Sequence, residues 1–183
     1  MFKKLGVFVV LLICFAAILF KMNSSFGLTL VSVDAQVTTV DEGGLFCGAP
    51  LAGASFAVGH YALKSSSSSL DVGELTLVSG TPHDDVHLLP VRLEGKAVYK
   101  LAQYESCNSE SIRLFSLDSN GRIEPLSFVK DGVSSFEVSS DYTAKVDYVD
   151  GVFRFCPYDN VSGAAICDSY LYKEGALQYE KSM

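Results

Sequence analysis

Apolar and polar residues alternate over short segments along most of this chain, and turn-forming residues separate these segments. Such alternation is typical of β-strands that bury one face. No segment after residue 27 keeps the 3.6-residue period of an amphipathic helix, so we expect a mostly β protein. The pattern predicts strands at 75–78, 86–93, 97–104, 112–117, 123–129, 133–138, 142–149, 152–158, 164–172 and 176–179.

Glycine-containing clusters lie between many of these segments, at 94–96, 118–121, 131–132, 150–151 and 173–175. Gly, Asn and Asp tolerate the positive φ angles that tight hairpin turns require. Short turns join antiparallel neighbours, so the expected fold is one antiparallel β-meander or β-sandwich. The Asp118 cluster lacks the acidic positions of an EF-hand frame, and we interpret it as a hairpin turn.

A two-residue turn at Asp150-Gly151 would pair residues whose numbers sum to 301, with Asp147 facing Arg154. The opposite surface then carries only apolar residues, as a half-buried hairpin requires. These residues are Ala144, Val146, Tyr148, Phe153, Phe155 and Pro157.

A second hairpin is predicted around the turn formers at 159–163, with facing residues that sum to 323. This register sets Cys156 opposite Cys167, close enough for a disulfide. It also places Asp168 on the apolar face beside Tyr170. Either Asp168 meets a tyrosine hydroxyl there, or the register slips after Cys156.

Five cysteines are present, and Cys14 lies within an N-terminal apolar run. Pairing Cys156 with Cys167 leaves Cys47 to pair with Cys107, so we expect two disulfides in an exported domain. No Cys-x-x-Cys spacing occurs, which disfavours a zinc site made by these cysteines.

The front of the domain carries weaker strand signals than the rest of the chain. Residues 28–33 and 37–40 are prone to form β-structure, whereas 43–59 are rich in Gly and Ala. The latter could form a packed loop or strands with close backbone approach. The serine run 65–69 predicts an exposed internal loop.

The N-terminus carries Lys3 and Lys4, then an uncharged apolar run at 5–20, then Lys21. This order is typical of an export signal or a membrane anchor. Sixteen helical residues span about 24 Å, and flanking lysines can snorkel to the headgroups. We therefore expect a retained anchor in 1–27 and an extracytoplasmic domain in 28–183, periplasmic or at the cell surface. Cleavage near Gly27, giving a secreted protein, and lipidation at Cys14 are the alternatives.

The predicted domain is acidic. Removing Lys3, Lys4 and Lys21 from the 14 Lys and Arg leaves 11, against 21 Asp and Glu, a net charge of −10. Phosphate backbones would be repelled, so nucleic acid is excluded as an expected partner. The partner expected from the anchor is a protein in a membrane or envelope complex, with a homo-oligomer as the alternative.

The strongest candidate for chemistry is the sequence His83-Asp84-Asp85-Val86-His87. His83, Asp85 and His87 would share one face of an extended segment and could ligate a transition metal. Their outer members would then be about 13 Å apart, so a bend is needed. The alternative is an exposed acidic turn that leads into the strand at 86–93.

The segment Gly53-Ala54-Ser55-Phe56-Ala57 resembles a nucleophile elbow without its last glycine, and His60 lies nearby. No convincing strand and helix flank it, so we expect neither catalysis nor a cofactor. The leading hypothesis is a membrane-anchored accessory or binding module. The alternatives are a secreted subunit that self-assembles after signal cleavage and a metal-binding protein that uses His83 and His87.

Overall fold

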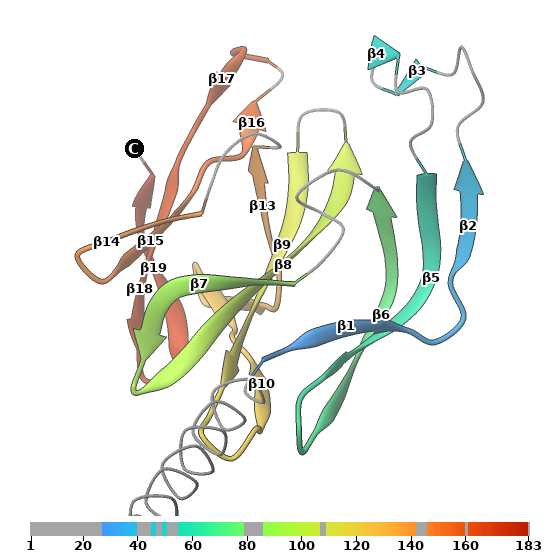
Figure 1. The fold of residues 1–183 in the computed structure, drawn as a ribbon. Helices are drawn as coiled ribbons and strands as arrows, with labels where there is room; N and C mark the ends of the chain where they lie inside the picture. The colour runs from blue at the N-terminus through green and yellow to red at the C-terminus, as the bar shows by residue number, and fades with distance from the viewer. Residues whose placement is uncertain are drawn as a thin grey trace, which may run out of the picture.

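The computed structural model describes residues 27–39, 45–46, 49–50, 55–78, 86–106, 109–141, 146–159 and 161–182. This part of the chain contains β-strands and no helix, which confirms the prediction of a mostly β domain (Figure 1). The strands are β1 (Thr29–Ser32), β2 (Gln36–Thr39), β3 (Leu45–Phe46), β4 (Ala49–Pro50), β5 (Ser55–Lys64), β6 (Ser69–Val78), β7 (Val86–Leu93), β8 (Lys96–Ser106), β9 (Ser109–Leu117), β10 (Ile123–Pro125), β11 (Phe128–Lys130), β12 (Val133–Ser135), β13 (Val138–Asp141), β14 (Asp147–Val149), β15 (Val152–Phe155), β16 (Tyr158–Asp159), β17 (Ala164–Ala165), β18 (Asp168–Lys173) and β19 (Ala176–Ser182).

The strands form three main sheets. In the first, β5 pairs with β6 along one edge and with both β1 and β2 along the other. In the second, the order is β7-β8-β9, and β10 and β13 both pair with β9. The third has the order β12-β11-β19-β18-β15-β14 and contains one parallel pair, β11 with β19. The remaining strands pair as β3 with β4 and β16 with β17.

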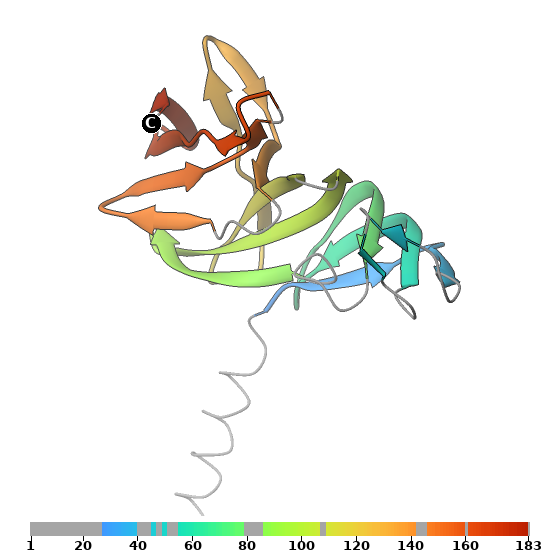
Figure 2. The ribbon, with the colours of Figure 1, turned by 90° about the horizontal axis from the view of Figure 1, so that it is seen from above.

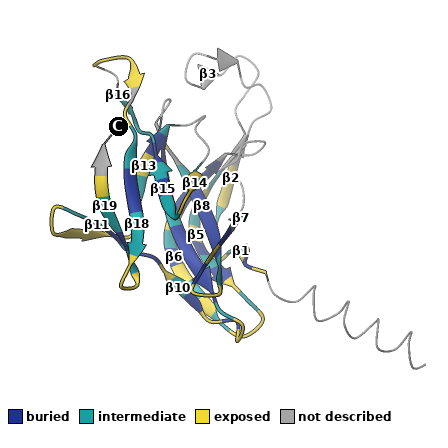
Figure 3. Ribbon diagram, turned by 90° about the vertical axis from the view of Figure 1, so that its left-hand side faces the viewer, coloured by how far each residue is buried: buried dark blue, intermediate teal, exposed yellow. Residues whose placement is uncertain are grey.

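The second sheet lies between the other two and is buried on both faces (Figures 2 and 3). Side chains alternate along β8, so that Val98 and Ala102 enter one core whereas Tyr99 and Leu101 enter the other. The first core joins the second and third sheets, and the second core joins the first and second sheets. The protein is therefore a layered β-structure with two hydrophobic cores.

Aromatic rings fill the core beneath the third sheet. The ring of Phe128 meets those of Phe155 and Tyr170 edge to face, with both centroid distances 5.4 Å. Phe153 stacks on Phe155 at 6.4 Å. Buried aromatic pairs of this kind contribute about 0.5–1.5 kcal/mol each beyond their area burial, so this cluster anchors the sheet.

The predicted glycine turns are present. Four of them have the same form, in which Glu94, Asp131, Asp150 and Glu174 adopt φ angles between 49° and 54° and each precedes a glycine with φ between 78° and 84°. Two successive positive φ angles are the signature of a type I′ turn, which matches the twist of the flanking strands. The sequence cue and the geometry therefore agree at these turns.

Both predicted hairpin registers are confirmed. Asp147 faces Arg154 across the Asp150 turn, and Phe155 faces Asp168 across the next hairpin, which is the 323 register. The register between β15 and β18 does not slip. Asp168 instead lies where Lys130 can reach it: Lys130 Nζ donates to its carboxylate at 2.6 Å and lies 4.5 Å from the centroid of the Tyr179 ring.

Four predicted strands are interrupted in the structure and are therefore wrong as continuous elements. The segment 123–129 divides into β10 and β11, and 133–138 divides into β12 and β13. In each case the chain leaves one sheet and enters another, because β10 and β13 pair with β9 whereas β11 and β12 pair in the third sheet. The segments 152–158 and 164–172 are likewise interrupted, before β16 and after β17.

The serine run forms the connection between β5 and β6, as predicted, but it also has a specific partner. Ser65 Oγ and Ser68 Oγ donate to the Gly121 carbonyl at 2.5 and 2.7 Å, and Ser67 Oγ donates to Asn120 O at 2.5 Å. The loop is therefore hydrogen-bonded to the turn between β9 and β10, and it links the first two sheets.

Gly59 provides a test of the packing between β5 and the segment between β1 and β2. A Cβ atom at this position would lie 2.5 Å from Ala35 Cα and 2.9 Å from Ala35 N. Gly59→Ala should therefore destabilise the fold by about 1–3 kcal/mol and lower the Tm by several degrees. Gly27→Ala is the control, since nothing lies within 4 Å of that position. Equal melting temperatures for the two variants would contradict the close approach.

Candidate functional site

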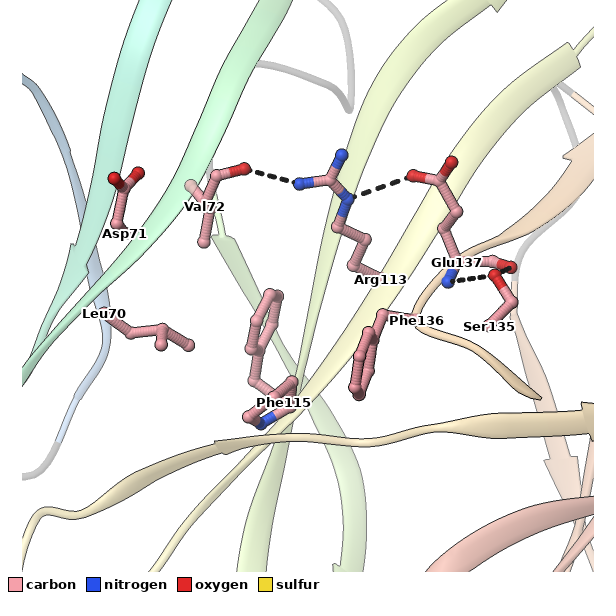
Figure 4. A pocket seen from close by; sticks show the side chains of 9 residues that line it. Leu70, Asp71, Val72, Arg113, Phe115, Ser135, Phe136 and Glu137 are labelled. Atoms are coloured by element: carbon pink, nitrogen blue, oxygen red, sulfur yellow. Dashed lines mark hydrogen bonds and ion pairs between the residues drawn. The ribbon is translucent and has the colours of Figure 1, made fainter.

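A groove of about 430 Å³ opens where the first and second sheets meet the connection between β12 and β13 (Figure 4). Strand β6 forms one wall, β9 and β10 form the floor, and the β12–β13 connection forms the other wall. The lining residues are Leu70, Asp71, Val72, Arg113, Phe115, Pro125, Ser135, Phe136 and Glu137.

Arg113 crosses the groove from β9 and ties its two walls together. Its Nη1 donates to the Val72 carbonyl on β6 at 2.6 Å. Its Nε donates to Glu137 Oε2 at 3.2 Å, and Ser111 Oγ donates to the same oxygen at 3.2 Å. The guanidinium therefore sets the distance between β6 and the β12–β13 connection, as Figure 4 shows.

Phe136 stands at the apex of the β12–β13 connection with 58% of its surface exposed. Ser135 and Glu137 fix it from both sides, because Ser135 Oγ accepts from Glu137 N at 3.1 Å and donates to Glu137 O at 2.9 Å. The phenyl ring is thus held beside the groove by a constrained backbone. An exposed aromatic side chain in a fixed position is a common anchor of binding surfaces.

The residues that line the groove suit the binding of a ligand or a peptide. Leu70, Phe115, Pro125 and Phe136 offer apolar contact, while Asp71 and the pair of Arg113 with Glu137 supply polar groups at the rim. Concave apolar surfaces with a few fixed polar groups are typical of ligand and peptide sites. The groove can therefore take an apolar side chain and orient the segment that carries it.

A second polar feature is buried at the β8–β9 pair. Glu110 is 1% exposed, and its carboxylate lies 3.7 Å from Lys100 Nζ. Burial raises the pKa of Glu110 to about 7, Lys100 opposes this rise, and Asp141 adds to it. An internal ion pair of this kind contributes to pH dependence more than to net stability.

Of the predicted metal ligands, His83 and Asp85 lie outside the described residues. His87 belongs to β7, where only its backbone is described. Within the described ranges no group of three or more His, Cys, Asp or Glu side chains could hold a metal ion. The metal site at His83, Asp85 and His87 therefore stays a prediction.

The predicted disulfide between Cys156 and Cys167 is present, with the two Cα atoms 3.9 Å apart. It closes the base of the β16–β17 hairpin. Cys156 also contacts β13, since Asp141 N donates to Cys156 O at 2.5 Å and Cys156 N donates to Ser140 Oγ at 3.3 Å. Cys47 and Cys107 lie outside the described residues, so their pairing stays a prediction.

His60, which lies near the elbow-like segment 53–57 in the sequence, pairs with Asp34. The His60 amide donates to Asp34 Oδ1 at 2.7 Å, and its Nδ1 lies 3.3 Å from Oδ2. The first of these bonds is the main cause that lowers the pKa of Asp34. Ser55 and His60 are five positions apart along the same strand, about 16 Å, so the two cannot act as a nucleophile and base.

The groove residues were not singled out by the sequence. Arg113 is the one cation within β9, a strand that is otherwise largely buried, and Phe136 directly follows Ser134 and Ser135. Both signals are weak, because neither residue has a spacing that implies chemistry.

Comparisons with known protein families, with curated proteins and with solved structures find no match to this chain. In the part that the structure describes, no helix is long and apolar enough to cross a membrane. The predicted anchor segment at 5–20 lies outside that part.

Glu110 predicts a pH dependence of stability. Its pKa of about 7 in the fold exceeds the ordinary 4.5, so between these values the folded state binds more protons than the unfolded state. Stability should fall by about 2–3 kcal/mol as pH rises through this window, then level off above it. Urea unfolding from pH 5 to 8 measures this. Glu110→Gln should flatten the profile, whereas Glu105→Gln, an exposed residue of the same hairpin, should not; a sloping profile in Glu110→Gln would refute the assignment.

A second prediction concerns the contribution of the Cys156–Cys167 disulfide to the free energy of unfolding. Replacing both cysteines, as Cys156→Ser with Cys167→Ser, should cost about 2–3 kcal/mol, because the unfolded chain gains the freedom of an 11-residue loop. Urea unfolding of the full chain, followed by tyrosine fluorescence, measures the change. Val161→Ser at the exposed tip of the same hairpin is the control. An unchanged midpoint in the double variant would show that the crosslink is dispensable.

Proposed function

We propose that this chain is a membrane-anchored, extracytoplasmic binding module that has no catalysis of its own and joins a larger membrane or envelope assembly. Residues 5–20 serve as the tether, and the acidic β-domain presents its groove to a protein partner. The domain faces the periplasm or the cell surface.

The observation that carries the binding role is the groove with Phe136 at its rim. Phe136 is 58% exposed although its backbone is fixed by neighbouring hydrogen bonds. An apolar ring held in water is costly to a monomer but favours association, since little conformational freedom is lost on binding. The walls are joined by Arg113, so the groove is formed before a partner arrives.

Two further features support an extracytoplasmic setting. The disulfide between Cys156 and Cys167 requires an oxidising compartment to form and persist. The basic and apolar N-terminus is typical of a segment that delivers the chain across a membrane. The net charge of −10 in 28–183 favours a partner surface that carries Lys and Arg.

Native mass spectrometry of the tagged full chain, released from its own membranes in mild detergent, tests this function. The wild-type chain should retain residues 1–27 and a protein partner. Phe136→Ser should weaken the complex by about tenfold or more, because about 1.5–3 kcal/mol of apolar burial is lost. Val161→Ser is the matched control, since Val161 is 95% exposed and lies outside the groove.

Three results would contradict the proposal. A complex that survives Phe136→Ser unchanged would remove the groove from the interface. An equal loss of the partner in Val161→Ser, outside the groove, would show that the groove has no special part in binding. A soluble chain that lacks the first ~27 residues would replace the tethered module with a secreted subunit.

A further inference from the structure

Strand β12 is an open edge of the six-stranded sheet, and it leads directly into the groove. Among the strands that the structure describes it pairs only with β11. All three of its residues are exposed, and Val133 shows 69% of its surface. Soluble proteins usually protect such edges by keeping them short or with charges, Pro or bulges; β12 is short, with three residues, but contains no charge and no Pro. Its hairpin with β11 is gold in Figure 2.

The register shows which backbone groups of β12 are available. Lys130 and Val133 flank the two-residue turn and therefore exchange ladder hydrogen bonds, and the same holds for Phe128 and Ser135. Ser134 faces Val129 in the pair between them. The N–H and C=O of Ser134 therefore point away from β11, toward the open edge.

Charge opposes the use of this edge by a second copy of the chain. An antiparallel pair of β12 strands centred on Ser134 would match residues whose numbers sum to 268. Asp131 of each copy, in the turn before β12, would then lie near Glu137 of the other, just past the end of β12, and both residues are exposed. Like charges brought close together in this way are destabilising. The same two carboxylates would attract a strand that carries Lys or Arg at both ends.

The nearby cations Lys130 and Arg113 do not fully neutralise the negative charge of this surface. Lys130 is paired with Asp168 on β18. Arg113 pairs with Glu137, whose side chain nevertheless remains 50% exposed. Asp71, on the far wall of the groove, is also exposed. The edge and the groove therefore form one surface of acidic character with an apolar centre.

We infer that the partner of this module is an extended peptide segment with basic flanks, which adds to β12 as a further strand and places an apolar side chain in the groove. Ser135 belongs to both parts of this surface, as the last residue of β12 and as a lining residue. Backbone hydrogen bonds to Ser134 supply affinity, and the groove selects the side chain. This inference rests on the proposed binding function and specifies its mode.

A library of randomised twelve-residue peptides, displayed on phage and selected on the full chain in detergent, provides the probes. Enriched peptides should carry an aromatic or aliphatic residue flanked by Lys or Arg, and should bind Phe136→Ser at least tenfold more weakly. Ser134→Pro, which removes the outward N–H, should also weaken binding at least tenfold. Ser119→Pro is the matched control, because Ser119 is the second residue of an exposed turn, where Pro is favoured.

N-methylation along a selected peptide distinguishes the modes of binding. Strand addition uses the N–H groups of alternate residues, so methylation should abolish binding with a period of two. Binding that depends on Phe136 but has no such period, and tolerates Ser134→Pro, would overturn strand addition while leaving the binding function intact. Failure to enrich any Phe136-dependent peptide would overturn both. A dimer of the chain that Ser134→Pro dissolves would show that the edge serves a second copy, contrary to this inference.

Discussion

Burial of the middle sheet on both faces is the constraint on which the other features depend. In β8 and β9 successive side chains enter opposite cores, so neither strand has a solvent face along most of its length. Each core requires a covering sheet, and this requirement places the first and third sheets on either side. A fully buried pair of strands also explains why polar residues within it, such as Lys100 and Glu110, are paired with each other.

The groove is a consequence of how the chain moves between these layers. A strand can pair in only one sheet at a time, so the chain leaves the third sheet at the end of β12 and enters the second sheet at the start of β13. The two residues between these strands cross from one sheet to the other. Phe136 lies in this crossing and cannot enter either core. Ser135, Glu137 and Arg113 hold the crossing in place with side-chain hydrogen bonds. The same change of sheet therefore creates both the exposed ring and the open edge beside it.

Local features of the sequence were sufficient for a large part of the fold. Strand positions, four positive-φ turns and the registers around Asp150 and the 159–163 turn all depend on residues close in the chain. The Cys156–Cys167 disulfide follows from the same register. The residue that this register left unexplained, Asp168, is matched by Lys130, a residue 38 positions earlier in the chain.

The candidate site could not be predicted from local features of the sequence. Its residues come from β6, β9, β10 and the β12–β13 connection, and their proximity depends on pairings between distant segments. The sequence by itself determined the strands, turns and local registers, because turn chemistry and side-chain alternation act over a few residues. Only the tertiary structure decided where strands break, how the sheets stack and which side chains meet in the groove. Those outcomes depend on which strand faces pack against apolar faces of distant strands, and no local sequence pattern specifies that packing.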